Sequence, residues 1–276
     1  MEQPLVSCIM PTRNRRDFVA QALHYFEQQD YPNKELVIVD DSDELIVDLI
    51  AGRPDVRYHS IQYIHTTGGK RNMACELSRG EIICHWDDDD WYSPTRLSYQ
   101  VNALLASNAD LNGLHMQSVF DIEHMQGWEC TDINSIQPGV NGIHHGTLVY
   151  WRNVWLNRVR FQDTSKGEDM IFVRRLINLG GRVDTLPCLH HQVYIRHGRN
   201  GWKYRPGTTT GAFSSPELWH RVSPERCVPQ EDMAYYLTMR AQLLQKRRAN
   251  SKSSTIKRQL DRLLSGGLVP ALSFKR

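Results

Sequence analysis

The chain has 276 residues, of which 40% are hydrophobic and 23% charged, and its formal net charge at pH 7 is +2. This composition is typical of a soluble globular protein and excludes a disordered chain and a polytopic membrane protein. The low net charge argues against a nucleic-acid partner. The charge is unevenly distributed, because residues 240–276 hold ten Lys or Arg and one acidic residue, a local charge of +9.

The six cysteines are widely spaced, and their spacing resembles neither a zinc cluster nor a small disulfide scaffold. The first residues lack the long apolar core of a signal peptide. No segment approaches the ~20 apolar residues that span a bilayer. We therefore expect a cytoplasmic protein.

The first part of the chain alternates short apolar runs with helical patterns. Strands are predicted at residues 5–10, 35–39 and 81–86, with a mixed strand and loop at 56–64. Helices are predicted at residues 17–29, 44–51, 70–79 and 95–107. Repeated strand–helix–strand units predict an α/β fold with a mostly parallel central sheet flanked by helices. Ligands of such sheets bind beyond the carboxyl ends of the strands.

The second part of the chain is less regular. We predict strands at residues 113–123, 146–151 and 182–195, and an amphipathic helix at 168–179. Further helices are predicted at about 231–248 and 256–264, on either side of a linker rich in Lys and Ser.

The strongest motif is HWDDDDWYSP at residues 85–94, where a predicted buried strand leads into four consecutive carboxylates. Adjacent carboxylates repel one another, and burying them requires cations. Mg²⁺ or Mn²⁺ held by one or two carboxylates and by diphosphate oxygens would supply that charge. The alternative is a solvated acidic turn, although the strand before it and the aromatic residues around it favour the metal.

Three further motifs place charged residues beside predicted elements. Asp40 and Asp41 follow the strand ELVIV, where a carboxylate can bind a base or ribose; an Asp-rich turn is the alternative. Arg71 follows a glycine pair and can donate to phosphate, and its alternative is a solvated helix arginine. Glu168 and Asp169 begin a predicted helix, which suits either ordinary capping or a general base for a hydroxyl nucleophile.

The segments VSCIMPTRNR, ELVIVDDSD, GGKRNMACELSRGEIICHWDDDDWYSPTRL and GEDMIFVRRL, in that order, resemble family 2 glycosyltransferases of the GT-A fold. The resemblance covers roughly residues 4–200. It implies an inverting, metal-dependent transfer of a sugar from a nucleotide-diphosphate donor to an acceptor hydroxyl. UDP is the commonest nucleotide in the family, so a UDP-sugar is the expected donor.

The resemblance also implies a donor site. Pro11, Thr12 and Asp41 would border the nucleotide base, and Arg71 the base or the diphosphate. The segment HTTGGKRN departs from the family, which has more Gly and small residues there, and this leaves the role of Arg71 open.

In the same resemblance, the family's DxD motif corresponds to Asp87, Asp88 and Asp89. Asp87 and Asp88 would lie nearest the ribose and the sugar, and Asp89 would bind Mn²⁺ or Mg²⁺. His197 corresponds to the histidine that completes the metal site in many GT-A enzymes. Because four acids stand in a row, Asp90 is an alternative in a register shifted by one.

Asp169 corresponds to the catalytic base of the family's ED motif, and would take the acceptor's proton as the donor's anomeric carbon is attacked. Two other functions are considered. A nucleotidyltransferase would carry a Gly-rich loop after the first strand, where this chain has PTRNRRD. A carbohydrate-binding module without catalysis would not need both Asp89 and Asp169.

We expect a GT-A domain over residues 1–211 and a basic helical C-terminal extension over 212–276. The sequence does not reveal the acceptor, which is a glycan, a lipid-linked glycan or a protein. Ile256, Leu260, Leu263 and Leu264 lie on one face of a helix with basic residues away from its centre, so this extension could bind an anionic membrane peripherally. The alternative is that this face packs on the enzyme or a second subunit.

Overall fold

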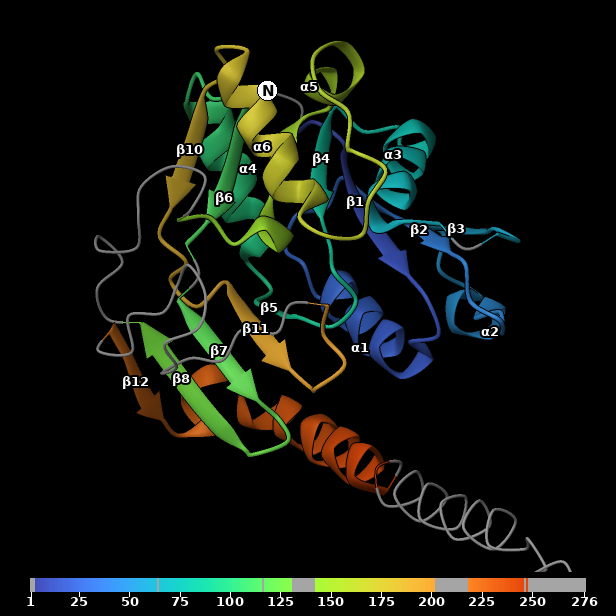
Figure 1. Ribbon diagram of the computed structural model, residues 1–276, viewed down its shortest axis with the longest axis vertical. Helices are drawn as coiled ribbons and strands as arrows, with labels where there is room; N and C mark the ends of the chain where they lie inside the picture. Colours follow the sequence, from blue (N-terminus) through green and yellow to red (C-terminus); the bar gives the residue numbers. More distant parts are fainter. Residues whose placement is uncertain are drawn as a thin grey trace, which may run out of the picture.

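The computed structural model describes residues 3–63, 65–115, 117–130, 142–201, 218–245 and 247. Within these residues the strands form two sheets, one of seven strands and one of five (Figure 1). The larger sheet has the order β10-β6-β9-β4-β1-β2-β3. Its strands are, in chain order, β1 (Val6–Thr12), β2 (Lys34–Asp40), β3 (Val56–Ser60), β4 (Ile82–His85), β6 (Leu111–Leu114), β9 (Val149–Trp151) and β10 (Val183–Leu186).

The larger sheet is mostly parallel, as expected. β1 pairs in parallel with both β2 and β4, and β9 is antiparallel to its two neighbours, β4 and β6. The parallel strands β1, β2 and β4 are short and almost wholly buried, because helices cover both faces of the sheet.

The helices divide between the two faces. They are α1 (Arg16–Glu27), α2 (Val47–Ile50), α3 (Thr67–Leu77), α4 (Arg96–Ala106), α5 (Arg152–Asn157) and α6 (Glu168–Asn178). Alternate residues of β1 show the division, since Cys8 and Met10 face a core with α1 and α4 while Ile9 faces a core with α3, α5 and α6. The predicted helix at 44–51 is reduced to the four residues of α2.

Two predicted strands are each divided between the two sheets. The run at 113–123 forms the end of β6 and then β7 (Ser118–Asp121), and the run at 182–195 forms β10 and then β11 (Gln192–Arg196). The five-stranded sheet has the order β12-β8-β7-β11-β5. Its remaining strands are β5 (Trp91–Tyr92), β8 (Gln126–Cys130) and β12 (Trp219–Val222).

The described part of the C-terminal region contributes both strand and helix. β12 pairs with β8, a short helix α7 (Pro224–Cys227) follows, and residues 230–245 are helical. Tyr236 and Met239 are buried in the same core as α1 and α4. The expected boundary between residues 211 and 212 and the amphipathic segment at 256–264 both lie outside the described residues, so they stay predictions.

Candidate functional site

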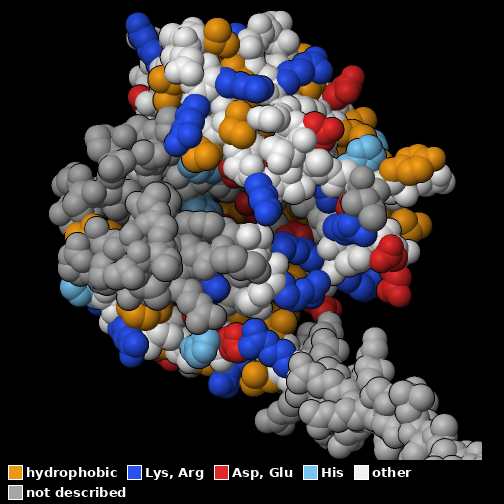
Figure 2. Space-filling model, viewed as in Figure 1, with side chains coloured by type: hydrophobic (Ala, Val, Ile, Leu, Met, Phe, Trp, Pro, Cys, Tyr) orange, Lys and Arg blue, Asp and Glu red, His pale blue; other side chains and the backbone are white. Residues whose placement is uncertain are grey.

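The acidic run lies at the carboxyl ends of the central strands. β4 ends at His85, and Asp87–Asp90 follow it beside the end of β1 at Thr12 and the end of β2 at Asp40. Lys and Arg side chains gather at the edge of a hollow near the middle of the view in Figure 2, with acidic side chains visible inside it. This is the edge of a parallel sheet where ligands are expected.

Asp41 is held by a buried lysine. Lys70 Nζ in α3 donates to Asp41 Oδ1 at 2.6 Å and to the Thr12 carbonyl at 2.8 Å, and the His65 amide donates to Asp41 Oδ2 at 2.9 Å. The preceding residue, Asp40, faces another way and accepts from Tyr58 Oη at 2.9 Å. The structure thus brings Thr12 and Asp41 together, with Pro11 one residue earlier in β1, as the predicted nucleotide site requires.

Arg15, at the start of α1, joins two aspartates. Its Nη1 lies 2.7 Å from Asp88 Oδ1 and 2.6 Å from Asp89 Oδ2, and Thr12 Oγ1 donates to Asp88 Oδ2 at 2.6 Å. Sequence reasoning did not identify Arg15 or Lys70 as site residues. The available signal was the position of Arg15 just beyond the end of β1, next to the strand β4 that the acids follow, although Arg16 at the next position pairs with Asp48 instead.

Asp89 also meets the predicted histidine. His197 follows β11, and its Nε2 lies 3.0 Å from Asp89 Oδ2, while its ring packs against Phe18 with centroids 4.4 Å apart. Burial alone would raise the pKa of Asp89, but Arg15 and His197 hold it below its usual value. Asp89 is therefore ionised at neutral pH, and Arg15 and His197 both lie within hydrogen-bond distance of its Oδ2.

Asp90 accepts hydrogen bonds from two residues of β11. Its carboxylate accepts from the Ile195 amide at 3.1 Å and from Gln192 Nε2 at 2.8 Å. These bonds connect residues Asp87–Asp90, here called the acidic loop, to β11. Burial raises the pKa of Asp90 well above its usual range. These contacts give Asp90 two donors within the protein, and the register of the DxD motif stays a prediction.

Arg71 connects the acidic loop to the start of α6. It is buried in α3, its Nη2 lies 2.9 Å from Asp87 Oδ1, and its Nη1 lies 3.5 Å from Asp169 Oδ2 and 3.4 Å from Glu168 Oε1. Burial raises the pKa of Asp87 to about 6 in spite of Arg71. For Asp169 burial is again the largest single cause and raises the pKa, but Arg71, His145, His144 and the Met170 amide together outweigh burial and lower the pKa.

A glycine leaves room beside Asp87. A Cβ atom on Gly146 would lie 2.6 Å from Asp87 Oδ2 and 3.1 Å from His144 Cε1, so a larger residue would displace one of them. His144 has its pKa lowered to about 3 by burial and packs against Tyr194, and it is thus neutral. His144 is therefore a packed, neutral residue beside Asp87.

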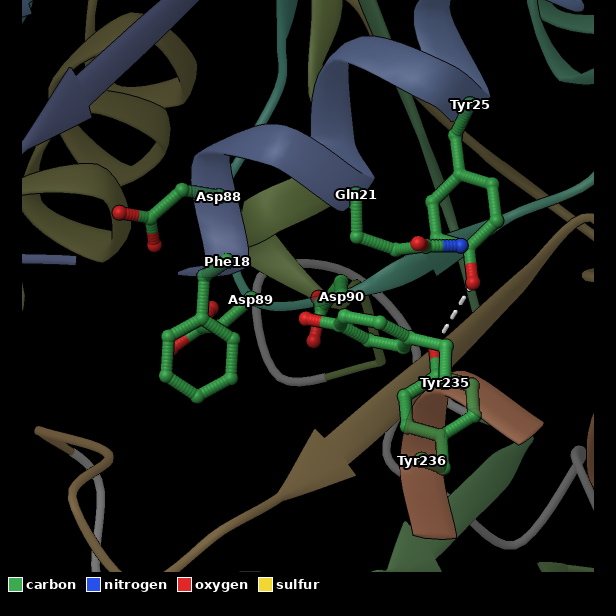
Figure 3. Close-up of a pocket in the computed structure, with 8 residues that line it drawn as sticks. All are labelled: Phe18, Gln21, Tyr25, Asp88, Asp89, Asp90, Tyr235 and Tyr236. Carbon is green, nitrogen blue, oxygen red and sulfur yellow. Dashed lines mark hydrogen bonds between the residues drawn. The ribbon is translucent and has the colours of Figure 1, made fainter. Parts of the chain in front are cut away.

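The back of the acidic loop is covered by the C-terminal helical residues 230–245. Figure 3 shows a small cavity, about 10 Å³, between α1, the acidic loop and this helix, with Tyr25 and Tyr236 hydrogen-bonded across it. Its lining residues are Phe18, Gln21, Tyr25, Asp88, Asp89, Asp90, Tyr235 and Tyr236. The cavity is too small for a sugar or a nucleotide.

The side chains present fit a divalent cation whose coordination shell would be completed by a bound diphosphate. No group of three or more His, Cys, Asp or Glu in the described ranges is arranged to hold a metal. Asp89 Oδ2 and His197 Nε2 nevertheless meet at one point, and the other ring nitrogen of His197 is buried without a hydrogen-bond partner. Mg²⁺ commonly takes one or two protein ligands and fills its shell with water and phosphate oxygens.

The sequence of residues 7–143 matches the family model described as glycosyl transferase family 2. The chain belongs to this family. WcaA of Escherichia coli K12, named as a colanic acid biosynthesis glycosyl transferase, is 40% identical over 103 residues, which are 34% of this chain and 36% of WcaA. WfgD of E. coli, named as a UDP-Glc:α-D-GlcNAc-diphosphoundecaprenol β-1,3-glucosyltransferase, is 28% identical over 113 residues, 39% of this chain and 44% of WfgD.

The family 2 chain spans less than half the length of these relatives. Its fold is similar to the crystal structure of S. aureus TarS residues 1–349 with UDP-GlcNAc, with a TM-score of 0.57 and 18% identity over 74% of this chain and 62% of that one. This likeness confirms the expected GT-A fold. Among the described residues, no helix is long and apolar enough to cross a bilayer.

The structure brings the predicted site residues of this family 2 chain to one edge of the sheet. Thr12, Asp88, Asp89 and His197 form one hydrogen-bonded chain with Arg15. A second group contains Asp87, Arg71 and Asp169, and Asp41 is joined to Thr12 through Lys70. The roles assigned to these residues stay predictions.

Proposed function

We propose that this chain is an inverting glycosyltransferase that moves a sugar from a nucleotide-diphosphate donor to an acceptor hydroxyl. The observation that carries the proposal is the position of Arg71 between Asp87 and Asp169. One guanidinium thus links the acidic loop, where the donor is expected, to a carboxylate at the start of a rigid helix. That arrangement provides a binding side and a proton-accepting side across one reaction centre.

Asp169 has the properties of a general base. Arg71, His145, His144 and the Met170 amide together outweigh burial and keep the pKa of Asp169 below the usual value, so the carboxylate is ionised at neutral pH and able to accept a proton. Its neighbour Glu168 has its pKa raised by burial and is itself buried, whereas the side chain of Asp169 is 23% exposed. We therefore assign the proton transfer to Asp169.

The donor side would be formed by Pro11, Thr12, Asp41, Arg71, Asp87 and Asp88. Asp89 and His197 would hold Mn²⁺ or Mg²⁺, which supplies Lewis-acid stabilisation of charge on the leaving diphosphate when bound. Arg71 and Arg15 are positioned to offset the remaining carboxylate charge around the same site.

The names of a relative and of a similar structure support a choice of donor class and acceptor class. WfgD is named for UDP-Glc and for a diphosphoundecaprenol acceptor, and TarS was crystallised with UDP-GlcNAc. We propose a UDP-hexose as the donor and a lipid-linked glycan as the acceptor of this chain. Contact with the membrane through the basic C-terminal extension, residues 212–276, stays a prediction, because its amphipathic segment at 256–264 lies outside the described residues.

The test is a screen of nucleotide sugars for hydrolysis by the purified protein, with Mn²⁺ or Mg²⁺ present and nucleoside diphosphate as the measured product. We expect UDP to be released from UDP-glucose or UDP-N-acetylglucosamine. Release of inorganic pyrophosphate from UTP and a sugar phosphate would instead identify a nucleotidyltransferase. Binding of sugars without any release of UDP would identify a non-catalytic module.

A further inference from the structure

Arg15 occupies the carboxylate oxygen that the proposed metal would use. Its Nη1 lies 2.6 Å from Asp89 Oδ2, the same oxygen that lies 3.0 Å from His197 Nε2, and it also lies 2.7 Å from Asp88 Oδ1. The side chain of Arg15 is 22% exposed and those of Asp88 and Asp89 are 3% and 12% exposed. The guanidinium is therefore a close counter-ion inside a mostly buried cluster.

A divalent cation and this guanidinium would compete for Asp89 Oδ2. A divalent cation would need carboxylate oxygens as ligands, and Asp89 Oδ2 already has Arg15 and His197 within hydrogen-bond distance. A divalent metal ion and the Arg15 guanidinium at the same oxygen would repel each other strongly in a partly buried site. A metal ion that uses Asp89 Oδ2 thus competes with Arg15 for this oxygen, and displacement of Arg15 would also remove compensating charge from Asp88.

We infer that Arg15 is a built-in competitor of the metal, which makes strong metal binding depend on the nucleotide diphosphate. The inference rests on the proposed function, since it takes Asp89 and His197 as the metal ligands. A diphosphate carries negative charge into the site and offers the displaced guanidinium new acceptor oxygens. Without the diphosphate, a metal ion brings neither negative charge nor acceptor oxygens for the guanidinium, so Arg15 competes fully with the metal for Asp89.

The wild-type protein provides the first measurement. Isothermal titration calorimetry would give the affinity for Mn²⁺ alone, for UDP alone, and for each in the presence of the other. We expect UDP to tighten Mn²⁺ binding by at least about tenfold, and Mn²⁺ to tighten UDP binding by the same factor, as thermodynamic linkage requires. Equal Mn²⁺ affinity with and without UDP would refute the inference whatever the variants do.

The second measurement removes the competitor. Arg15→Gln should bind Mn²⁺ alone about tenfold or more tightly than the wild type, and the coupling between Mn²⁺ and UDP should shrink. Arg16→Gln is the matched control, because Arg16 is the next residue, pairs with Asp48 at 2.8 Å, and both partners are largely exposed. An Arg15→Gln protein that binds free Mn²⁺ no better than Arg16→Gln would contradict the competition.

The melting temperature gives an independent readout. Without Arg15 the buried carboxylates lack their counter-ion, so Arg15→Gln should melt lower than the wild type and regain stability with Mn²⁺ alone. The wild type should gain little from Mn²⁺ alone. None of these measurements requires turnover. If Mn²⁺ and UDP tighten each other's binding but no donor releases UDP, the transferase proposal is refuted. If a donor releases UDP but Mn²⁺ and UDP bind independently, the role of Arg15 is refuted.

Discussion

Trp91 donates its indole Nε1 to Asp232 Oδ2 over 2.7 Å, although the two residues are 141 positions apart. Trp91 follows the four aspartates directly, and Asp232 belongs to the C-terminal helical residues 230–245. Both side chains are buried, so the bond is shielded from water. The C-terminal helix therefore supports the acidic loop from behind.

We predict that Asp232→Ala destabilises the protein by about 1–3 kcal/mol, because the buried indole N–H of Trp91 loses its acceptor. Asp232→Asn keeps a carbonyl acceptor and should cost less. The free energy of unfolding in urea measures both effects. Glu231→Ala, at the exposed neighbouring position, should leave it unchanged. Equal losses for Asp232→Ala and Glu231→Ala would show that the bond contributes nothing.

The catalytic base is tested by Asp169→Asn. The amide keeps the size of the side chain but cannot accept a proton at neutral pH, so transfer should fall about 10²–10⁴-fold. UDP binding should persist. Glu168→Gln is the comparison, because Glu168 also faces Arg71 but is buried. Transfer that survives Asp169→Asn and disappears with Glu168→Gln would move the base to Glu168.

The metal is tested by Asp89→Ala, which removes the oxygen shared by Arg15 and His197. We expect metal-dependent turnover to be nearly abolished while the fold is retained. EDTA should silence the wild type, and added Mn²⁺ should restore its activity. Full turnover in EDTA would show that the donor is cleaved without a metal.

Asp90 provides the contrasting case. Asp90→Ala leaves the Ile195 amide and Gln192 Nε2 without their acceptor, so the free energy of unfolding should fall by about 1–3 kcal/mol. The affinity for Mn²⁺ in the presence of UDP should be unchanged in the fraction that is folded. If Asp90→Ala instead abolished Mn²⁺ binding at full stability, the DxD motif would have the shifted register.

The pKa of about 6 for Asp87 predicts a pH dependence. Since this value exceeds the ordinary pKa of Asp, near 3.9, the folded protein binds a proton that the unfolded chain has released. The contribution of Asp87 to stability therefore rises as the pH falls from about 7 to 4. As the pH falls from about 7 through the pKa of Asp87, the affinity for UDP should also fall, because ionised Asp87 is the form expected to bind the donor. A titration of UDP affinity against pH measures this, and Asp87→Asn should lack the step.

The central sheet could be predicted because its buried parallel strands are short apolar runs separated by helical patterns. The division of residues 113–123 and 182–195 between two sheets could not be predicted from periodicity, since both halves of each run are largely apolar. Pro187 was one available signal in the second run. In the structure it is followed by Leu189 and His190, which both have positive φ angles in the turn before β11.

The candidate site could be predicted where carboxylates follow strand ends. Asp41 and Asp87–Asp89 converge because β1, β2 and β4 are neighbouring parallel strands. The partners of these acids were harder to predict. The pairing of Arg15 with Asp88 and Asp89 depends on how α1 is placed, and the support from Asp232 depends on a helix that returns from the far end of the chain.

The hydrogen bond between Tyr25 and Tyr236 joins residues 211 positions apart, and it has a consequence for synthesis of the protein on the ribosome. At about 5–20 residues per second, the partner of Tyr25 is added roughly 10–40 s after Tyr25 itself. During that interval the side of α1 that Tyr236 will cover is exposed in the nascent chain. The acidic loop likewise lacks its C-terminal support until then, so a chain released before residue 232 should be a substrate for chaperones rather than an enzyme.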